Sequence, residues 1–404
     1  MGTVGVVGAG PAGIAAALAA AEVGARVVLF DTNRSVGRKL SVTGNGRGNL
    51  TNLAATAEHY HCASRATIEA LLGAFGPAAL RRYLVELGVL TYSTEDGWCY
   101  PVSESAATVA ELLAAALDLA GVDVRLLTKV DGLERSGRGW EIRHSGGSAR
   151  VPVDRVVVAT GGMAAPSFGS TGSLYPVLAQ LGVRVLPSRP ALAPLVGDMR
   201  RWHRLQGVRL DAAVRLLQRG RELGREHGNL MFTQSGLSGP AAMNLSHLVA
   251  DPAQPELEAA IDLAPTHGDA LSSLVRRFGG TRMPLAVLLG AVVPPKVPPV
   301  ILSLAGLPAS VSLDQVPFDV AAEAIERLRD LRVAITGTRG FAQAQLSTGG
   351  VPLTEVEAAT MECRECVGLY LAGEVLDVVG PCGGYNLQFA FSSGRVAGRA
   401  AGRA

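Results

Sequence analysis

The chain has 404 residues, of which 48% are hydrophobic and 18% are charged, and it contains 49 glycines. This composition is ordinary for an α/β protein of two or three domains. The formal net charge of +2 is too small to indicate a nucleic-acid-binding protein. Lysine occurs only at Lys39, Lys129 and Lys296 while arginine is abundant, so arginine clusters carry little weight in this sequence.

The five cysteines are too few for a disulfide framework in a chain of this length. Cys363 and Cys366 have the C-x-x-C spacing of a redox dithiol or of half a zinc site. No second pair and no histidine lies at metal-ligand spacing from them. We therefore interpret them as two reduced thiols in a loop before a strand, and we expect no zinc.

The first 21 residues carry no charge and resemble a signal peptide or a membrane span in that respect. They lack the basic region of a signal peptide, and glycines and a proline interrupt any membrane helix. We expect no membrane association and a cytoplasmic location.

The segment TVGVVGAGPAGIAAALAAAEVGARVVLFD, residues 3–31, reads as strand, tight turn, helix and strand. Residues 3–7 and 26–30 are β-branched runs typical of buried parallel strands. The turn between the first strand and the helix is a G-x-G-x-x-G motif made of Gly8, Gly10, Pro11, Ala12 and Gly13. Its glycines allow a sharp turn, close approach to a pyrophosphate and helix–strand packing, so we predict a dinucleotide-binding turn.

Asp31 ends the second strand, with 17 residues between it and the last glycine of the motif. A carboxylate here accepts hydrogen bonds from a ribose 2′-OH and repels a 2′-phosphate. The site should therefore take FAD or NAD rather than NADP. No second G-x-G-x-x-G motif occurs, and three later segments favour a flavin.

The first of these segments is SVTGNGRGNLTN, residues 41–52. Roughly twenty loop-like residues follow Asp31, where an NAD site would usually return quickly to a helix. Their glycines allow positive φ and close backbone approach, and Arg47 and Lys39 supply positive charge. We predict that this loop folds over the pyrophosphate and the flavin.

The second segment is a buried strand that ends in Ala159, Thr160 and Gly161. In flavoproteins of the two-dinucleotide-binding type, an A-T-G at a strand end marks where the chain passes near the cofactor. The third segment, residues 368–398, places Gly373 and Glu374 after a strand, where a carboxylate can bind the ribityl chain of FAD. The final helix, beginning near Gly384, Tyr385 and Asn386, can point its N-terminus at the flavin N1/O2 edge and stabilise the reduced anion.

The sequence GRKLSVTGNGRGNLTN resembles the G-R-K-L-x-x-S-G-x-G-R-C-N-x-T-N signature of the HI0933-like (YhiN-like) flavoproteins, FAD-dependent oxidoreductases often labelled the aminoacetone oxidase family. Residues 228–246 and 342–356 also resemble this family, so the resemblance spans nearly the whole chain. It implies FAD as cofactor. The cleft residues that it implies are Lys39, Gly44, Gly46, Arg47, Asn49, Thr51 and Asn52, and the expected cofactor-binding set also includes Val130 and Leu387. The family usually has a cysteine where this chain has Gly48, which puts any role of that thiol in doubt.

The predicted fold is α/β: a Rossmann-like FAD-binding domain with an inserted β-barrel-like domain and a small helical subdomain. From about Pro187 the sequence alternates and turns like antiparallel strands, and later segments read as several helices. We predict that residues 1–187 and 336–404 form the FAD-binding domain. Residues 188–265 and 331–335 should form the barrel-like domain, and residues 266–330 the helical subdomain.

Two classes of function stay open on these residues. The first is an FAD-dependent oxidoreductase with hydride transfer at flavin N5. The family resemblance implies a small amine or aminoketone as substrate, with O2 as acceptor, or as the alternative an RNA base such as ribosomal uridine. The electron donor or acceptor, NAD(P)H or O2, stays open. Eight arginines in residues 200–225 could form an RNA surface, but we interpret them as a solvated face. The second class is a structural protein whose bound FAD does not turn over. No catalytic acid or base is identified.

Overall fold

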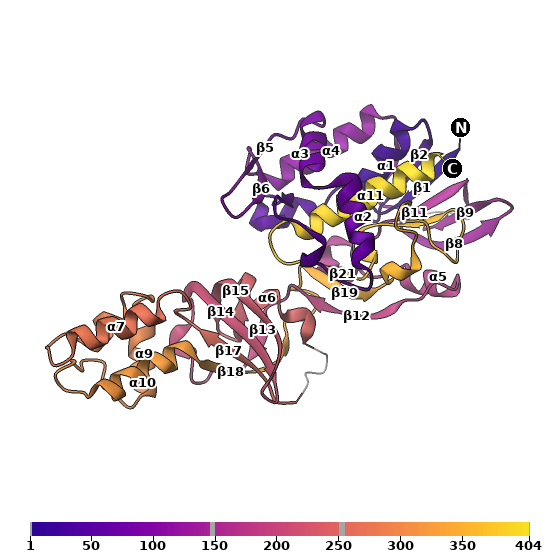
Figure 1. Ribbon diagram of the computed structural model, residues 1–404. Coiled ribbons are helices and arrows are strands. Elements are labelled where there is room, and N and C mark those ends of the chain that lie inside the picture. Colours follow the sequence, from indigo (N-terminus) through magenta and orange to yellow (C-terminus); the bar gives the residue numbers. More distant parts are fainter. Residues whose placement is uncertain (1, 146–149, 250–254, 404) are drawn as a thin grey trace. The chain divides into compact units, whose positions relative to one another are not determined.

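The computed structural model describes residues 2–145, 150–249 and 255–403, and the chain forms two compact units (Figure 1). The first unit comprises Met1–Arg189 and Gln345–Ala404, and the second comprises Pro190–Ala344. The division of the second unit into separately folding barrel and helical domains stays a prediction.

A five-stranded parallel sheet forms the centre of the first unit. In spatial order its strands are β20 (Leu369–Leu371), β11 (Arg155–Val158), β1 (Thr3–Val7), β2 (Arg26–Phe30) and β7 (Asp123–Arg125). The two strands predicted at residues 3–7 and 26–30 are confirmed. Their side chains are almost all buried, as is typical of strands in a parallel sheet that is covered on both faces.

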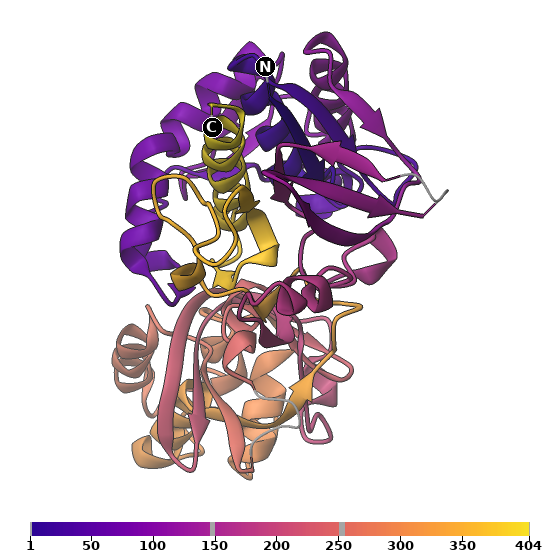
Figure 2. The same ribbon diagram turned by 90° about the vertical axis from the view of Figure 1, so that its right-hand side faces the viewer.

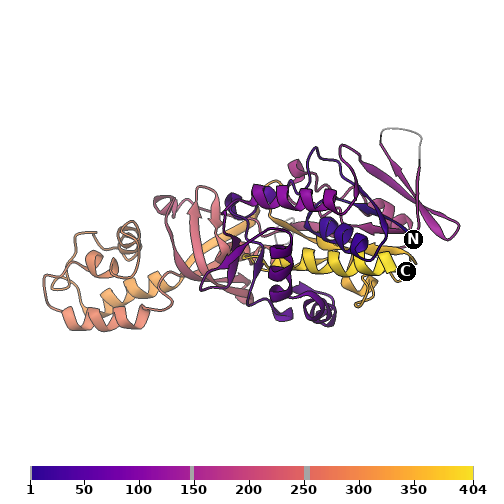
Figure 3. The same cartoon turned by 90° about the horizontal axis from the view of Figure 1, so that it is seen from above.

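Six α-helices lie in the described part of the first unit. They are α1 (Pro11–Glu22), α2 (Arg65–Phe75), α3 (Pro77–Glu86), α4 (Ala106–Leu119), α5 (Tyr175–Gln180) and α11 (Tyr385–Arg403). Of these, α1, α4 and α11 pack against the sheet. Figure 3 shows α11, in yellow, beside the indigo α1. Their backbones touch, because a β-carbon at Gly394 would clash with the Ala12 carbonyl oxygen and one at Gly398 with the Ala16 carbonyl oxygen.

The described residues also form three small antiparallel ladders and one further pair of strands, β12–β19. They are β10–β9–β8 (Val151–Val153, Gly139–His144, Val130–Ser136), β3–β6–β5 (Thr51–Asn52, Trp98–Pro101, Thr91–Ser93), β21–β4 (Val378–Val379, His61–Cys62) and β12–β19 (Leu186–Ala191, Leu346–Gly350). The chain leaves the first unit through β12 and returns through β19.

The second unit contains a closed six-stranded barrel and several helices (Figures 1 and 2). Around the barrel the order is β13 (Leu195–Gly197), β16 (Gly236–Ser238), β15 (Arg221–Thr233), β14 (Arg209–Gln218), β17 (Leu257–Asp262) and β18 (Leu331–Thr338). The helices are α6 (Pro240–Met243), α7 (Gly268–Phe278), α8 (Leu285–Leu289), α9 (Val297–Leu304) and α10 (Phe318–Arg329). Buried and more exposed residues alternate along much of β14, as expected for a strand with one face in a core. The predicted fold class, an α/β protein with a barrel, is confirmed.

Cys363 and Cys366 are free thiols just before β20, and their side chains are buried. Cys366 donates a weak hydrogen bond from Sγ to the Leu181 carbonyl oxygen at 3.4 Å. Burial raises the pKa of the Cys363 thiol to about 11. Among the residues that the structure describes, no three metal-binding side chains gather into a cluster.

No helix within the described ranges is long and apolar enough to cross a lipid bilayer.

Cys363 and Cys366 should resist alkylation by iodoacetamide in the folded protein at mildly alkaline pH. The reactive species is the thiolate. Burial raises the pKa of the Cys363 thiol to about 11 and also raises the pKa of the Cys366 thiol, which keeps the thiolate fraction low. Mass spectrometry of peptides after a timed reaction measures this, with the half-buried Cys62 and Cys382 as internal comparisons. All five cysteines should react once urea has unfolded the chain. Rapid modification of Cys363 in the folded protein would show that this pair is reactive.

Candidate cofactor site

The predicted glycine turn joins β1 to α1, and its three glycines have different tasks. Gly8 has a φ of +105°, and a side chain there would clash with the Ala159 carbonyl oxygen. Gly13 lies so close to the Gly8 carbonyl oxygen that it has no room for a β-carbon. Gly10, just before α1, has nothing within 4 Å of the place of a β-carbon. Packing therefore requires two of the glycines, and the third leaves the N-terminus of α1 open to an anion.

The Asp31 carboxylate closes this turn. Its Oδ2 accepts a hydrogen bond from the Ala9 N–H at 2.6 Å, and its Oδ1 accepts one from the Asn33 N–H at 2.7 Å. Each carboxylate oxygen can accept a second bond, so a ribose hydroxyl can still bind. Asp31 thus has a structural task that the sequence pattern does not reveal.

The loop predicted at residues 41–52 begins with a 3₁₀ segment, Leu40–Gly46, that is interrupted by a kink. Gly44, Asn45 and Gly46 all have positive φ angles. The Arg47 guanidinium donates to Glu104 at 2.8 Å and to the Tyr92 hydroxyl at 2.9 Å. The Arg47 side chain therefore has an exposed anionic partner within the protein, and its contact with the pyrophosphate stays a prediction.

Gly48 is buried and has a φ of +79°. A β-carbon there would lie 3.2 Å from the Cα and Cβ atoms of Ala106, at the start of α4. In this chain, a side chain at position 48 would therefore point toward α4. The geometry explains why glycine suits this position and gives a thiol here no evident catalytic task.

The polar residues at the end of the same stretch hold the start of α11. The Thr51 hydroxyl donates to Gln388 Oε1 at 2.5 Å, and Asn52 Nδ2 donates to the Gly383 carbonyl oxygen at 3.1 Å. Asn49, in the amide orientation that satisfies both of its ends, donates to the Thr51 carbonyl oxygen at 3.0 Å. All three side chains are buried, where polar groups need partners. Their direct contact with a cofactor stays a prediction.

Residues at the beginning of α11 also stabilise the turn that precedes this helix. The Asn386 amide accepts from the Gly380 N–H and donates to the Gly380 carbonyl oxygen, both at 2.8 Å. The Tyr385 carbonyl oxygen accepts from the Tyr60 hydroxyl at 2.9 Å, and burial raises the pKa of the Tyr385 phenol. Leu387 packs against the main core. Gly384 lies in this turn just before α11, and its backbone is not covered by a side chain of its own.

The A-T-G segment lies next to the glycine turn. The Ala159 N–H donates to the Val7 carbonyl oxygen at 2.8 Å, and the half-buried Thr160 and Gly161 follow it. Val130 is buried in the core. It stands two residues after Thr128, whose N–H donates to the Asp31 carbonyl oxygen. The structure thus brings Ala159 and the segment before Val130 to the turn formed by the motif and Asp31.

Lys39 and Glu374 form an ion pair with 2.7 Å between Nζ and Oε2. Their side chains are mostly buried, with exposed fractions of 24% and 14%. Two residues that sequence reasoning missed complete this cluster: Ser347, which bonds the Glu374 carboxylate, and Gly162, which leaves room for it. The available signal was their position, because Gly162 follows the A-T-G directly and Ser347 lies in the family-like segment 342–356.

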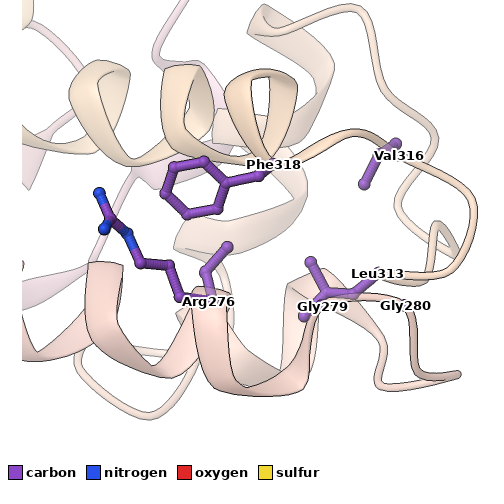
Figure 4. Close-up of a pocket in the computed structure, with 7 residues that line it drawn as sticks. Arg276, Gly279, Gly280, Leu313, Val316 and Phe318 are labelled. Carbon is purple, nitrogen blue, oxygen red and sulfur yellow. The ribbon is translucent and has the colours of Figure 1, made fainter.

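A pocket of about 350 Å³ lies in the second unit and is separate from these residues (Figure 4). It lies between α7 and α10, and the Arg276 guanidinium lies 4.8 Å from the centre of the Phe318 ring. None of the predicted cofactor-binding residues lines it.

The arginines of residues 200–225 are distributed over the barrel unit. Four of the eight form ion pairs, such as Arg200 with Asp198 and Arg215 with Asp330. Pairing of this kind is typical of a solvated face. It neither requires nor excludes a nucleic acid.

The fold and the residues around the two helix N-termini define a Rossmann-type flavoprotein. The chain matches the HI0933-like protein Rossmann domain over residues 2–400, and it belongs to this family. It is 35% identical to a 3-dehydro-bile acid delta(4,6)-reductase of Clostridium scindens over 99% of both chains. It is 30% identical to a ribosomal RNA dihydrouridine synthase of Escherichia coli over 96% of this chain and 95% of the relative.

A solved structure shares the fold at much lower identity. The 3-ketosteroid delta1-dehydrogenase of Sterolibacterium denitrificans matches with a TM-score of 0.55 and 12% identity over the whole of both chains. The prediction of an oxidoreductase with a flavin cofactor is confirmed by the family and the reductase relative. The alternative of a structural protein without turnover receives no support.

Asp31→Ala should lower both the stability of the protein without cofactor and its affinity for FAD. It removes two backbone hydrogen bonds to a carboxylate, each worth about 1–3 kcal/mol, and the expected ribose bonds. Urea unfolding and FAD titration of apo-protein measure the two effects. Asp154→Ala is the control, because Asp154 bonds the Thr3 N–H at the other end of β1. If both variants lose stability but keep wild-type FAD affinity, the ribose assignment is wrong.

Gly46→Val should weaken FAD binding on the order of tenfold, and Arg47→Ala should weaken it less. Valine tolerates a φ of +86° poorly and would distort the loop, whereas Arg47 is exposed and contacts Glu104. Flavin fluorescence during titration of apo-protein measures the affinity. Gly137→Val imposes the same kind of strain in the β8–β9 hairpin and serves as control. Equal affinity in all variants would show that residues 41–52 do not cover the cofactor.

Proposed function

We propose that this protein is an FAD-dependent reductase of a carbon–carbon double bond conjugated to a carbonyl group. The observation that favours FAD over a mononucleotide is the parallel packing of α1 and α11. Gly394 lies against Ala12, and Gly398 against Ala16, so both N-termini point the same way. The start of α11 lies eight residues, about 12 Å, beyond the start of α1. An extended dinucleotide can reach both N-termini, whereas a mononucleotide reaches one.

The residues at the two N-termini suit the parts of FAD. The open face at Gly10 suits the pyrophosphate, and Asp31 has acceptor capacity left for the ribose. Glu374 suits the ribityl chain. The Gly384–Tyr385 backbone at the start of α11 would meet the flavin, where a helix N-terminus favours negative charge. Each assignment takes a residue that was predicted from the sequence and names the group of that residue that the fold leaves accessible to the cofactor.

The substrate class follows from the reactions of the two relatives. A 3-dehydro bile acid with double bonds at positions 4 and 6 has them in conjugation with its 3-keto group. The double bond that is reduced to form dihydrouridine is likewise conjugated to a ring carbonyl. In both cases the conjugated carbonyl can take up the negative charge that develops when a hydride adds to the double bond, and a proton then completes the reduction. Neither relative is named for an amine, so the aminoketone expectation receives no support from them.

A bound flavin supplies the hydride from its N5 atom once it is reduced. We propose NAD(P)H as the source of that hydride, with the proton taken from the protein or from water. The task of this chain is to hold the cofactor, orient the substrate and exclude water. Ribosomal uridine is the second candidate substrate, because Arg201, Arg204 and Arg221 form no ion pair within the described part of the chain.

We also propose a cytoplasmic location, which five free thiols favour, because disulfides are rare in reducing compartments.

The purified protein should be yellow, and the cofactor released by denaturation should be FAD. Chromatography against FAD and FMN standards identifies it. A dinucleotide is expected because both helix N-termini and Asp31 would otherwise lack ligands. Recovery of FMN alone, or failure of apo-protein to bind added FAD, would disprove the cofactor assignment.

Under anaerobic conditions, NADH or NADPH should reduce the flavin, and a conjugated ketone should reoxidise it while gaining two hydrogens. The panel consists of a 3-keto-4,6-diene bile acid, a uridine-containing ribosomal RNA fragment and aminoacetone. Stopped-flow absorbance follows the flavin, and mass spectrometry follows the product. Reduction of the bile acid or of uridine supports the proposal and identifies the substrate source. Reduction of the flavin by aminoacetone, with no reaction of either alkene, would contradict it.

A further inference from the structure

The Glu374 carboxylate is fixed from two sides. Lys39 donates to Oε2 at 2.7 Å, and the Ser347 N–H and hydroxyl both donate to Oε1 at 3.0 Å. The two residues that supply these three donors, Lys39 and Ser347, come from segments far apart in the sequence. A carboxylate has about four acceptor sites, so one remains for a ligand.

The orientation of the Ser347 hydroxyl is itself determined. Ser347 is 1% exposed, and its Oγ accepts a hydrogen bond from the Met163 N–H at 3.0 Å. With that lone pair occupied, its single proton is directed to Glu374. Ser347 therefore links the turn after β11 to the turn after β20.

Gly162 leaves the space that this link needs. A β-carbon at Gly162 would clash with Ser347 Oγ and would lie 2.9 Å from Glu374 Oε1. The φ of Gly162 is not in the left-handed region, so the need for glycine here is steric. A methyl group would displace the serine hydroxyl, the carboxylate or both.

We propose that Ser347 is a positioning residue for the cofactor: it holds the Glu374 carboxylate in the orientation that receives a ribityl hydroxyl of FAD. The proposal rests on the proposed FAD function and names the residue through which Glu374 acts. A carboxylate that is already held loses less freedom when the ligand binds, so it binds more tightly. Lys39 balances its charge, which would otherwise repel the pyrophosphate.

The test compares Ser347→Ala with Thr348→Ala. Both remove a hydroxyl–carboxylate bond from β19, but Thr348 bonds Asp377, at 2.9 Å, rather than Glu374. Ser347→Ala should weaken FAD binding to apo-protein roughly tenfold, as expected for one hydrogen bond to a charged group. Thr348→Ala should change it by no more than about twofold. Equal losses in the two variants would mean that the hydroxyls only brace the strand, and would overturn the proposal.

A double-mutant cycle asks whether Ser347 acts through Glu374. In a Glu374→Ala background, Ser347→Ala should cause no further loss of affinity, and at saturating FAD both single variants should change the visible circular dichroism of the flavin in the same way. Additive losses would overturn the inference about Ser347. Wild-type affinity in Glu374→Ala would instead disprove the ribityl assignment, so the two failures are distinguishable.

Gly162→Ala should displace the Glu374 carboxylate by steric contact, without removing a hydrogen-bonding group. It should weaken FAD binding about tenfold, as Ser347→Ala should. Thermal unfolding of each apo-protein checks that the variants fold. Wild-type affinity in a folded Gly162→Ala protein would contradict the proposed geometry.

Discussion

The contact between α1 and α11 is the constraint on which the rest of the first unit depends. Gly394 and Gly398 meet the backbone of Ala12 and Ala16 without an intervening side chain. Only residues this small let two helix backbones approach so closely, and the four-residue spacing keeps the contact on one face of α11. Both helices run in the same direction, because Gly394, Gly398 and Gly402 lie against Ala12, Ala16 and Ala20 in that order. Segments from both ends of the chain thus meet at the place where we propose the ligand site.

The contact between α1 and α11 also explains why residues 41–52 include polar side chains. The start of α11 extends beyond α1 and needs other support, which Thr51 and Asn52 supply through Gln388 and Gly383. The family signature around these residues therefore includes side chains that stabilise a helix N-terminus. Their contact with a flavin stays a prediction.

Local pattern was enough to predict the first strand, the glycine turn, α1 and the second strand, because each is encoded by neighbouring residues. The barrel and the final helix were also predictable from alternation and turn signals. The partners of polar side chains were not. The Asn386 amide closes the turn at Gly380, and Arg47 pairs with Glu104, and no local pattern indicates these partners. Contact of either residue with the cofactor stays a prediction. The bond between Ser347 and Met163 joins residues 184 positions apart, which no local pattern encodes.

The charges around the proposed site offer few free cations to an anionic cofactor. Lys39 is paired with Glu374 and Arg47 with Glu104, so neither is an uncompensated positive charge. In the proposed site the attraction would come from backbone N–H groups at the starts of α1 and α11, whose dipoles favour negative charge. Such groups are fixed by the fold and lose no side-chain freedom on binding. We therefore expect the glycines that expose them to matter more to cofactor binding than these two basic residues.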